Sequence, residues 1–418
     1  MDKLIIKGGS KISGSINVHG SKNAALPIIV SSLLSEKTLK LSNVPNVVDV
    51  LNLIKLLKNY GVKIEYNKDK LKINPKKIKN LSADYDVVRK MRASVLILGP
   101  LLSRFGYSKI SLPGGCAIGT RPIDIHLEGL IKLGAIFKIE NGFVIGNVKN
   151  KLKGNNIKLP FPSVGATENI LMAAVLAQGE TVINNAAMEP EIEDLGNCLL
   201  SMGCKIEGLG TKKIFVQGVD SLKKTKHNVI SDRIVAGTYL ILAAMLNCKF
   251  EVKNFNPKHL ESLISILKKM GCNLELFNNS VKILPSNKLK SCNVITAPYP
   301  GFPTDLQAQL MALMSIVEGN SQIKETIFEN RFMHVPELNR LGAKIKLNKD
   351  KAYIKGGQKF KAAQVMASDL RASVSLVLAA LCAEGKTTIN RVYHLDRGYE
   401  KIERSIGKLG PKIKRVKG

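Results

Sequence analysis

The stretch "HLESLISILKKMGCNL", residues 259–274, combines an amphipathic helical segment with a short β-type run. Its apolar residues recur at helical spacing, and the glycine after them suits the left-handed conformation that ends many helices. The same pattern of an apolar residue, a glycine and a β-type run occurs six times along the chain. The glycines, which lie 68 to 73 residues apart, are Gly61, Gly134, Gly203, Gly271, Gly342 and Gly410. This regularity predicts six copies of one structural unit.

Each copy contains a second helical stretch, more apolar than the first and roughly forty residues before the repeat glycine. These stretches are predicted to begin at Asn23, Arg92, Gly165, Arg233, Asp305 and Arg371. Short β-type runs lie between and after the helices. The predicted unit is therefore strand-helix-strand-helix-strand-strand. Its period is too long for a solenoid repeat, which favours compact domains made of several units.

The sixth copy stops at "LGPKIKRVKG", residues 409–418, before its last strands. The start of the chain, "LIIKGGSKISGSINVHGSKN" (4–23), aligns with "AYIKGGQKFKAAQVMASDLR" (352–371). We therefore expect the amino-terminal tail to complete the last unit. The predicted domains are residues 22–229, with the first three units, and residues 1–21 plus 230–418, with the other three.

Length and composition limit the class of protein. A chain of 418 residues can form two or three domains. The longest apolar run, residues 372–383, is too short to cross a bilayer, and the first residues lack the features of a signal peptide. The seven cysteines are odd in number and contain no CxxC pair, which predicts free thiols in a reducing cytoplasm.

The formal charge of +30 suggests nucleic-acid binding, but its distribution argues against that function. The excess is mostly lysine, spread along the chain, without a basic block or interleaved aromatic residues. We therefore expect neither a nucleic-acid nor a membrane partner. The few arginines are more informative, because a guanidinium favours bidentate binding of carboxylate and phosphate.

Basic residues gather near the predicted starts of the apolar helices. Lys22, Arg92 and Arg371 lie at such starts, and Arg121, Arg331 and Arg397 lie in linking loops. Helix N-termini offer unpaired N–H groups and the positive end of the helix dipole. If equivalent starts face one cleft between two domains, that cleft attracts phosphates or carboxylates.

Asp305 is the one acid at such a start. It is either an N-terminal capping or first-turn charge, or a general base that removes a proton from a hydroxyl group.

Cys116 lies in the glycine-rich stretch "LPGGCAIGTRP", residues 112–122, and has no counterpart in the other repeats. It is either a chance loop cysteine or a functional thiol, because Arg121 nearby favours a thiolate. The other cysteines occupy repeat core positions or lack an evident partner. No Cys/His cluster has the spacing of a zinc site, and His126, His334 and His394 do not form a triad pattern.

Nine motifs carry a family resemblance: "GSKNAALPI", "RKMRAS", "LPGGCAIGTRPIDIH", "SVGATENI", "EPEIEDL", "FPTDLQAQ", "ENRFMHVPEL", "SDLRAS" and "HLDRGYE". In content, order and spacing they closely resemble the UDP-N-acetylglucosamine 1-carboxyvinyltransferase family, in the EPSP synthase superfamily of enolpyruvyl transferases. The resemblance covers essentially the whole chain. EPSP synthase itself shares the six-unit fold but not the cysteine loop.

The resemblance implies an α/β fold of two inverse α/β barrels, each of three repeats, that close over substrate. It implies that the 3′-hydroxyl of UDP-N-acetylglucosamine adds to C2 of phosphoenolpyruvate while C3 is protonated, and that phosphate is then eliminated. This is the first committed step of peptidoglycan precursor synthesis. No metal or organic cofactor is needed, because protonation of the enol carbon activates C2. We expect a monomer.

The resemblance also assigns roles to residues. Cys116 is the proton donor, able to form a phospholactoyl adduct and to react with epoxides such as fosfomycin. Asp305 deprotonates the hydroxyl, and Lys22, Arg121 and Arg397 hold phosphate. Arg92, Arg331 and Arg371 stabilise the carboxylate and the intermediate. Asn23 contacts substrate at its helix start. The nucleotide-sugar contacts are Arg121, Pro122, Ile123, Asp124, Ile125, Ser163, Val164, Gly165 and Ile327.

One departure and two alternatives accompany this prediction. Phe161 and Pro162 stand where some family members carry lysine and valine, which affects one nucleotide contact. One alternative is an enolpyruvyl transferase whose acceptor hydroxyl belongs to a phosphorylated compound; the Cys116 loop and "HVPEL" argue against it. The other is an inactive or nucleic-acid-binding repeat protein, and the intact Lys22, Cys116, Asp305 and Arg397 argue against inactivity.

Overall fold

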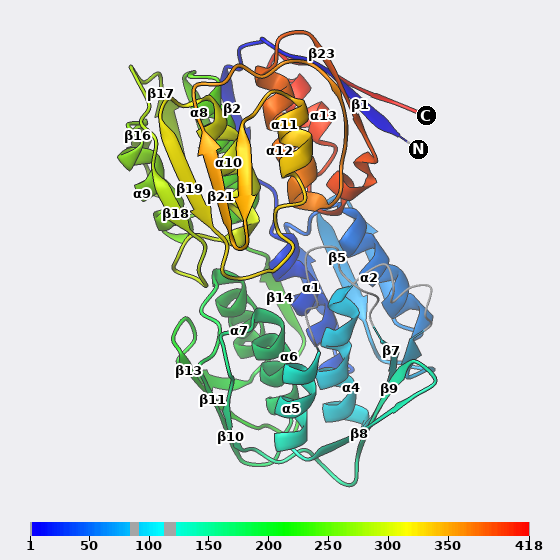
Figure 1. The fold of residues 1–418 in the computed structure, drawn as a ribbon. Coiled ribbons are helices and arrows are strands. Elements are labelled where there is room, and N and C mark those ends of the chain that lie inside the picture. The colour runs from blue at the N-terminus through cyan, green and yellow to red at the C-terminus, as the bar shows by residue number, and fades with distance from the viewer. Residues whose placement is uncertain (1, 84–91, 113–122, 418) are drawn as a thin grey trace. The chain divides into compact units, whose positions relative to one another are not determined.

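The computed structural model describes residues 2–83, 92–112 and 123–417, and the chain divides into two compact units (Figure 1). The amino-terminal unit lies between Gly20 and Ile230. The carboxy-terminal unit combines Met1–His19 with Ser231–Gly418. The described strands form six four-stranded sheets, three in each unit. Six sheets of one pattern confirm the predicted α/β fold of six repeats.

All six sheets share one arrangement, in which the first two strands pair in parallel and the next two pairings are antiparallel. In the amino-terminal unit the sheets are β14 (Thr225–Asn228), β3 (Leu39–Ser42), β5 (Lys70–Asn74) and β4 (Lys63–Asn67); β6 (Ser82–Ala83), β7 (Tyr107–Ser111), β9 (Phe143–Val148) and β8 (Ala135–Glu140); and β10 (Asn156–Lys158), β11 (Glu180–Asn184), β13 (Lys213–Gln217) and β12 (Lys205–Glu207).

The carboxy-terminal unit repeats this arrangement. Its sheets are β2 (Gly14–Asn17), β15 (Phe250–Lys253), β17 (Ser280–Leu284) and β16 (Asn273–Leu276); β18 (Asn293–Ile295), β19 (Asn320–Lys324), β21 (Lys351–Lys355) and β20 (Ile345–Asn348); and β22 (Gln364–Met366), β23 (Lys386–Asn390), β1 (Lys3–Lys7) and β24 (Lys412–Val416).

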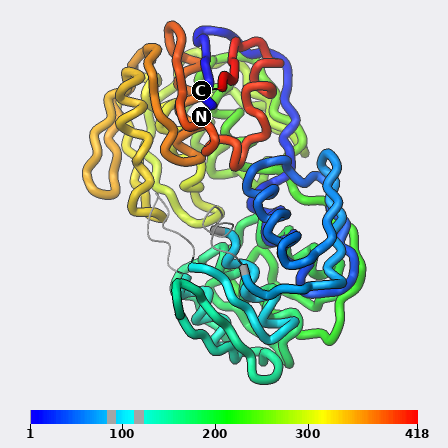
Figure 2. Tube along the Cα trace, turned by 90° about the vertical axis from the view of Figure 1, so that its right-hand side faces the viewer, coloured from blue at the N-terminus to red at the C-terminus, as the bar shows by residue number. Residues whose placement is uncertain are grey.

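Strands from distant parts of the chain close each unit. In the amino-terminal unit, β14 returns to pair in parallel with β3 of the first repeat. In the carboxy-terminal unit, β1 lies between β23 and β24, antiparallel to both, and both tube and ribbon views show the two chain ends together (Figure 2). The chain start thus supplies the strand that the last repeat lacks. The next strand, β2, pairs instead with β15 of the fourth repeat.

The more apolar helix of each repeat lies inside its unit. These inner helices are α1 (Lys22–Ser31) with η1 (Ser32–Leu34), η2 (Arg92–Ile97) with α4 (Leu98–Phe105), α6 (Val164–Ala174), α8 (Arg233–Met245), η4 (Thr304–Leu306) with α10 (Gln307–Ile316), and α12 (Leu370–Cys382). Every residue of α8 is buried, and α8, α10 and α12 contact one another. A helix without a polar face is expected at the centre of a domain.

The inner helix of the second repeat is not α-helical throughout. It begins as a 3₁₀ helix over Arg92–Ile97 and becomes α-helical only at Leu98. In a continuous α-helix the N–H of residue 100 would bond the carbonyl of Leu96. Pro100 has no N–H, and a proline is best tolerated in the first turn of an α-helix, where it now lies.

The amphipathic helices lie outside and end at the repeat glycines. They are α2 (Val48–Asn59), α5 (Asp124–Lys132), α7 (Pro190–Ser201), α9 (Glu261–Lys269) after η3 (Pro257–Leu260), α11 (Val335–Arg340), and α13 (Ile402–Gly407) after η5 (Val392–Arg397). All six repeat glycines have positive φ, from 92° at Gly61 to 117° at Gly410. In five outer helices the glycine directly follows the C-cap residue, which confirms the predicted left-handed end; α13 ends one residue earlier relative to Gly410.

No helix in the described parts of the chain combines the length and the apolar character that spanning a bilayer requires.

Candidate active site

The six predicted helix starts lie where the sequence places them. Each of these residues is the first or second residue of a helix: Asn23 of α1, Arg92 of η2, Gly165 of α6, Arg233 of α8, Asp305 of η4 and Arg371 of α12. The side chain of Arg92 lies outside the described part of the chain, as do Cys116, Arg121 and Pro122 entirely.

Several of these helix starts are capped by their own side chains. Ser21 and Ser163 each accept one backbone N–H, from Ala24 and Ala166. Asp232 accepts those of Ile234 and Val235, and Asp369 accepts those of Arg371 and Ala372. The expectation of unpaired N–H groups is therefore correct only in part, because the caps occupy one or two donors at each of these four helices.

Asp305, Arg331 and Arg371 come together in the carboxy-terminal unit, around the start of η4. Arg331 Nη2 lies 2.5 Å from Asp305 Oδ1, and Arg371 Nη2 lies 3.0 Å from Oδ2. Both arginines are buried, whereas the Asp305 side chain is 29% exposed. Each guanidinium uses one terminal nitrogen for this carboxylate. The geometry therefore places two fixed positive charges beside one accessible carboxylate.

The charge of Arg371 is maintained despite its burial. Burial by itself lowers the pKa of this guanidinium, but the neighbouring charge of Asp305 and the hydrogen bond to it raise the pKa above its ordinary value. Its backbone is fixed as well, because the Asp369 cap accepts the Arg371 N–H at 2.8 Å. Arg371 is thus a preorganised cation that faces Asp305.

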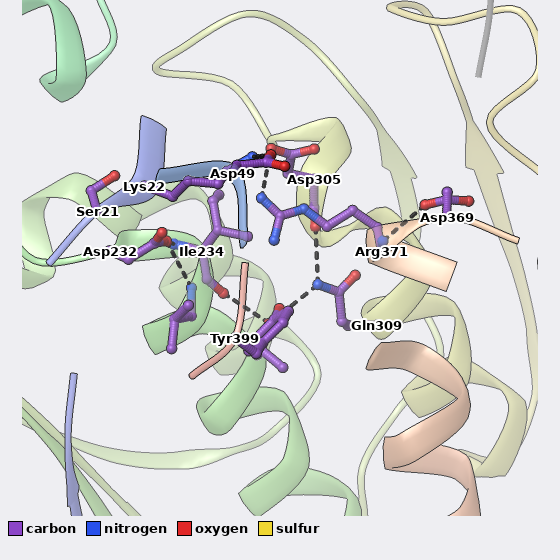
Figure 3. A network of polar contacts seen from close by, with 12 residues as sticks. Ser21, Lys22, Asp49, Asp232, Ile234, Asp305, Gln309, Asp369, Arg371 and Tyr399 are labelled. Atoms are coloured by element: carbon purple, nitrogen blue, oxygen red, sulfur yellow. Dashed lines mark hydrogen bonds and ion pairs between the residues drawn. The ribbon is translucent and has the colours of Figure 1, made fainter. Parts of the chain in front are cut away.

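A buried polar network lies next to η4, and Figure 3 labels two of its members, Gln309 and Tyr399. Gln309 Nε2 donates to the Asp305 carbonyl at 3.0 Å and to Thr238 Oγ1 at 3.1 Å. Thr238 Oγ1 in turn lies 2.8 Å from the hydroxyl of Tyr399. The sequence analysis missed these three residues. The available signal was a polar residue, Thr238 or Gln309, inside a stretch otherwise apolar enough to be an inner helix.

The turn before α11 positions Ile327 and Arg331. The buried carboxylate of Glu325 accepts the N–H groups of Ile327 and Phe328 and the hydroxyls of Thr296 and Thr304. The guanidinium of Arg331 lies over the Phe328 ring, 5.5 Å from its centroid. Glu325 thus fixes the turn that carries Ile327, a predicted nucleotide-sugar contact, and Arg331, a predicted anion ligand.

Lys22 begins α1 in the amino-terminal unit. Its ammonium lies 3.2 Å from the carboxylate of Asp49 on α2, and both side chains are largely buried (Figure 3). Such an ion partner offsets part of the cost of burying an ammonium group. The next residue, Asn23, lies in the first turn of the same helix.

The start of α6 carries Ser163, Val164 and Gly165, all half-buried. Gly165 packs against His126 of α5 so closely that an added Cβ would lie 3.0 Å from the imidazole Cε1. Asn169 Nδ2 lies 3.1 Å from His126 Nδ1 and also 3.0 Å from the carbonyl of Val95. Because the amide nitrogen is a donor, His126 Nδ1 accepts and the proton is on Nε2.

Ile123, Asp124 and Ile125 lie at the start of α5. The side chains of Ile123 and Ile125 are buried in the hydrophobic core, whereas Asp124 is exposed. The two isoleucines therefore offer a ligand only their backbone groups, and Asp124 offers its carboxylate.

Arg397 ends η5 in the carboxy-terminal unit and is half-buried. Within the described ranges, no group of three or more His, Cys, Asp or Glu side chains is arranged to hold a metal ion. The predicted proton donor, Cys116, belongs to residues 113–122, which the structure does not describe.

Comparison with known proteins identifies similar sequences over the full chain. Residues 6–406 match the model of the family EPSP synthase (3-phosphoshikimate 1-carboxyvinyltransferase). Three similar curated proteins are each named UDP-N-acetylglucosamine 1-carboxyvinyltransferase. They come from Pelagibacter ubique (53% identical), Paramagnetospirillum magneticum (50%) and Granulibacter bethesdensis (49%). The matches cover 100% of this chain and 99–100% of each relative.

Solved structures share the architecture. The enolpyruvyl transferase NikO from Streptomyces tendae superposes with a TM-score of 0.91 at 23% identity, over 99% of each chain. An EPSP synthase from Acinetobacter baumannii gives a TM-score of 0.78 at 21% identity, over the full length of both chains. At 21–23% identity, this similarity is evidence for a shared fold alone.

Proposed function

Since the chain belongs to the UDP-N-acetylglucosamine 1-carboxyvinyltransferases of the EPSP synthase family, we infer that it transfers the enolpyruvyl group of phosphoenolpyruvate to the 3′-hydroxyl of UDP-N-acetylglucosamine. Inorganic phosphate is released. The reaction is the first committed step of peptidoglycan precursor synthesis, and we place the enzyme in the cytoplasm as a monomer. The observation that carries this proposal is full-length identity of about half to relatives of that name, joined to the accessible Asp305 carboxylate between two buried guanidiniums.

The proposed reaction has two steps. In the addition, the 3′-oxygen bonds to C2 of phosphoenolpyruvate, the hydroxyl proton passes to Asp305, and the Cys116 thiol gives a proton to C3. In the elimination, the bond from C2 to the phosphate oxygen breaks and its electron pair leaves with the phosphate, which takes the proton from Asp305. C3 returns a proton to the Cys116 thiolate, which restores the double bond in the product. Both protonation steps are general acid–base catalysis.

Arg331 and Arg371 have two tasks in this scheme. Each guanidinium holds Asp305 through one nitrogen and has further N–H donors for the carboxylate of phosphoenolpyruvate. Because both are buried and fixed, they stabilise negative charge without having to reorganise during the reaction. Lys22, Arg121 and Arg397 bind the phosphate that leaves, and Arg92 stabilises the intermediate.

The nucleotide sugar is assigned to the amino-terminal unit and to Ile327. The start of α6, with Ser163, Val164 and Gly165, offers its remaining N–H groups and the positive end of its dipole to the diphosphate. Asn23 and the stretch from Arg121 to Ile125 complete the contacts. Phe161 is exposed beside this helix start, where some family members have lysine, so any contact there is apolar.

Phosphate release from phosphoenolpyruvate tests this function. We expect release only when UDP-N-acetylglucosamine is present. Release that depends instead on shikimate 3-phosphate would show that the enzyme uses a phosphorylated acceptor. No release with either acceptor would refute the transferase assignment.

Replacement of the proposed proton donor gives a second test. Cys116→Ser should reduce turnover at least a hundredfold, because a serine hydroxyl is a far weaker acid, whereas Cys116→Asp should retain activity. Cys248→Ser is the control, since the buried Cys248 donates to the Ala243 carbonyl and a serine can do the same. Wild-type turnover by Cys116→Ser would remove the role of Cys116.

A further inference from the structure

Residues 391–401 form a strained segment that carries Arg397. Arg391, before η5, has φ 57° and ψ 40°, and Lys401, before α13, has φ 39° and ψ 58°. Both are in the left-handed region, which non-glycine residues rarely adopt. Two such residues within eleven indicate that surrounding contacts determine the shape of this segment.

Arg415 of β24 provides the contacts from one side. Its guanidinium binds Asp396 with two bonds, Nη1 to Oδ2 at 2.9 Å and Nη2 to Oδ1 at 2.6 Å. The same group reaches Glu403 in the first turn of α13, at 3.2 and 3.3 Å. Asp2 approaches it at 3.5 Å. One planar guanidinium therefore joins both helices that flank the turn after Arg397.

The ion pairs of Arg415 with Asp396 and Glu403 form a clamp, and its base in strand β24 is rigid. Arg415 is paired with Leu4 of β1 and is flanked on both sides by further pairs of the β1–β24 ladder, which holds its backbone in place. The hydrogen bond with Asp396 outweighs partial burial and raises the pKa of Arg415 above its ordinary value. Isolated surface ion pairs contribute little, but a bidentate arginine that bridges two carboxylates belongs to the stronger class.

Tyr399 provides the contact from the other side. Its side chain is 2% exposed, and its hydroxyl lies 2.8 Å from Thr238 Oγ1 of α8. Arg397 therefore lies between two anchored residues, directly after Asp396 and two positions before Tyr399. The backbone of Arg397 has little freedom as long as both anchors hold.

We propose that Arg415 is a positioning residue for the reaction, acting through Asp396 to fix where the guanidinium of Arg397 meets the phosphate of phosphoenolpyruvate. The inference rests on the proposed function, in which Arg397 binds that phosphate. A displacement of a binding group by about 1 Å is enough to reduce rates strongly. Arg415 itself need not touch either substrate.

Steady-state kinetics provide the main test. Arg415→Ala should raise the KM for phosphoenolpyruvate about tenfold and leave the KM for UDP-N-acetylglucosamine within twofold. Arg415→Lys should have an intermediate effect, because an ammonium cannot bind two carboxylates with a planar fork. Asp396→Asn should reproduce the selective change, and the double variant should be no worse than either single one. An unchanged KM for phosphoenolpyruvate in a folded Arg415→Ala protein would overturn the proposal.

Hydrogen exchange gives a readout that does not depend on activity. Arg415→Ala should accelerate amide exchange at residues 392–401 while α12 keeps its wild-type rates. If wild type releases no phosphate, the proposed function fails, and unchanged exchange at 392–401 would separately overturn the clamp. Arg104→Ala is the matched control, since Arg104 holds the carbonyls of Leu33 and Ser35 and the carboxylate of Glu36 in the other unit. It should leave the KM for phosphoenolpyruvate unchanged.

Discussion

At the six cysteines that the structure describes, burial raises the pKa of the thiol. The pKa reaches about 12 at Cys198, Cys204, Cys272 and Cys382 and about 11 at Cys248, and it is also raised at Cys292. These thiols remain protonated near neutral pH and are poor nucleophiles.

The raised pKa values of these six thiols predict that labelling is selective for Cys116. A thiol-directed epoxide such as fosfomycin should modify the native protein once, at Cys116, as detected by intact-mass and peptide mass spectrometry at pH 7. Cys116→Ser should remove the label. Modification of any of the other six cysteines in the folded protein would contradict the prediction.

The buried His334 should make the stability of the fold depend on pH. Burial lowers the pKa of this imidazole from 6.5 to about 4, and its Nε2 has no hydrogen-bond partner in the described part of the chain. The unfolded chain therefore binds a proton here below about pH 6.5, whereas the folded protein binds it only near pH 4. The contribution of the neutral His334 to the free energy of unfolding is complete above pH 6.5. It falls by about 3 kcal/mol as the pH drops to 4.

The measurement compares variants across that range. Denaturant unfolding of wild type and His334→Asn between pH 4 and 7 should show a flatter profile for the variant. Asp369 and Arg331, the charged groups that act on His334, remain in both proteins. Parallel profiles would mean that His334 is protonated in the folded state as well.

At the level of residues, the sequence predicted the helix starts better than the side-chain contacts. Helix spacing placed Asp305 and Arg371 at helix starts, and their positions are confirmed. The ion pair between Asp305 and Arg331 depends on how the turn before α11 folds back, which local pattern does not specify. Thr238 and Gln309 were missed because a polar residue in an apolar helix acquires its meaning only from the partner across the core.

Among the elements, α8 depends on a charged cap. The carboxylate of Asp232 accepts the N–H groups of Ile234 at 2.9 Å and Val235 at 3.0 Å, and the residue is 4% exposed. Asp232→Ala should lower the free energy of unfolding by about 1–2 kcal/mol, because two buried donors lose their acceptor. Asp232→Asn should lower it much less. Equal stability of the two variants in chemical denaturation would argue against the cap.

The elements themselves were largely predictable. The repeat glycines mark the ends of the outer helices, and the absence of a polar face marks the inner ones. Ser21, Asp232 and Asp369 precede predicted helix starts and match known capping types, so the partial occupation of the helix N-termini was also visible in the sequence. The 3₁₀ start at Arg92–Ile97 was not predicted, because apolar periodicity does not distinguish two helix types over six residues.

At the scale of the molecule, a strand from the start of the chain stabilises the unit made from its end. Ile6 of β1 is fully buried among residues of the carboxy-terminal unit. Ile6→Ala should cost that unit about 2–5 kcal/mol through lost burial and the cavity left behind. Ile73→Ala, an equally buried change in β5, should destabilise the amino-terminal unit instead.

Unfolding followed by hydrogen exchange distinguishes the two cases. Ile6→Ala should accelerate exchange in β23 and β24 but not in β3 or β4, and Ile73→Ala should do the reverse. Loss of protection in the amino-terminal unit on changing Ile6 would contradict this division of the chain.

Self-similarity also suggested where the tail pairs, but not that its two strands enter different sheets. The alignment of residues 4–23 with 352–371 compares sequence, whereas β1 and β2 join the sixth and fourth repeats. Adjacent sheets have the same pattern of strand directions. The choice between them is therefore made by three-dimensional closure, which a linear comparison does not contain.

The placement of β1 has a consequence for synthesis on the ribosome. Lys7 pairs with Lys386, so about 380 residues must be translated before this strand meets its partner. At typical elongation rates of about 5–20 residues per second, β1 waits for roughly 20–75 s after it leaves the exit tunnel. The amino-terminal unit can fold during that delay, whereas the carboxy-terminal unit cannot be completed until translation nears its end. Throughout the delay the apolar residues of the nascent tail lack the partners that bury them in the folded unit, so this tail is exposed to chaperones and to non-native contacts.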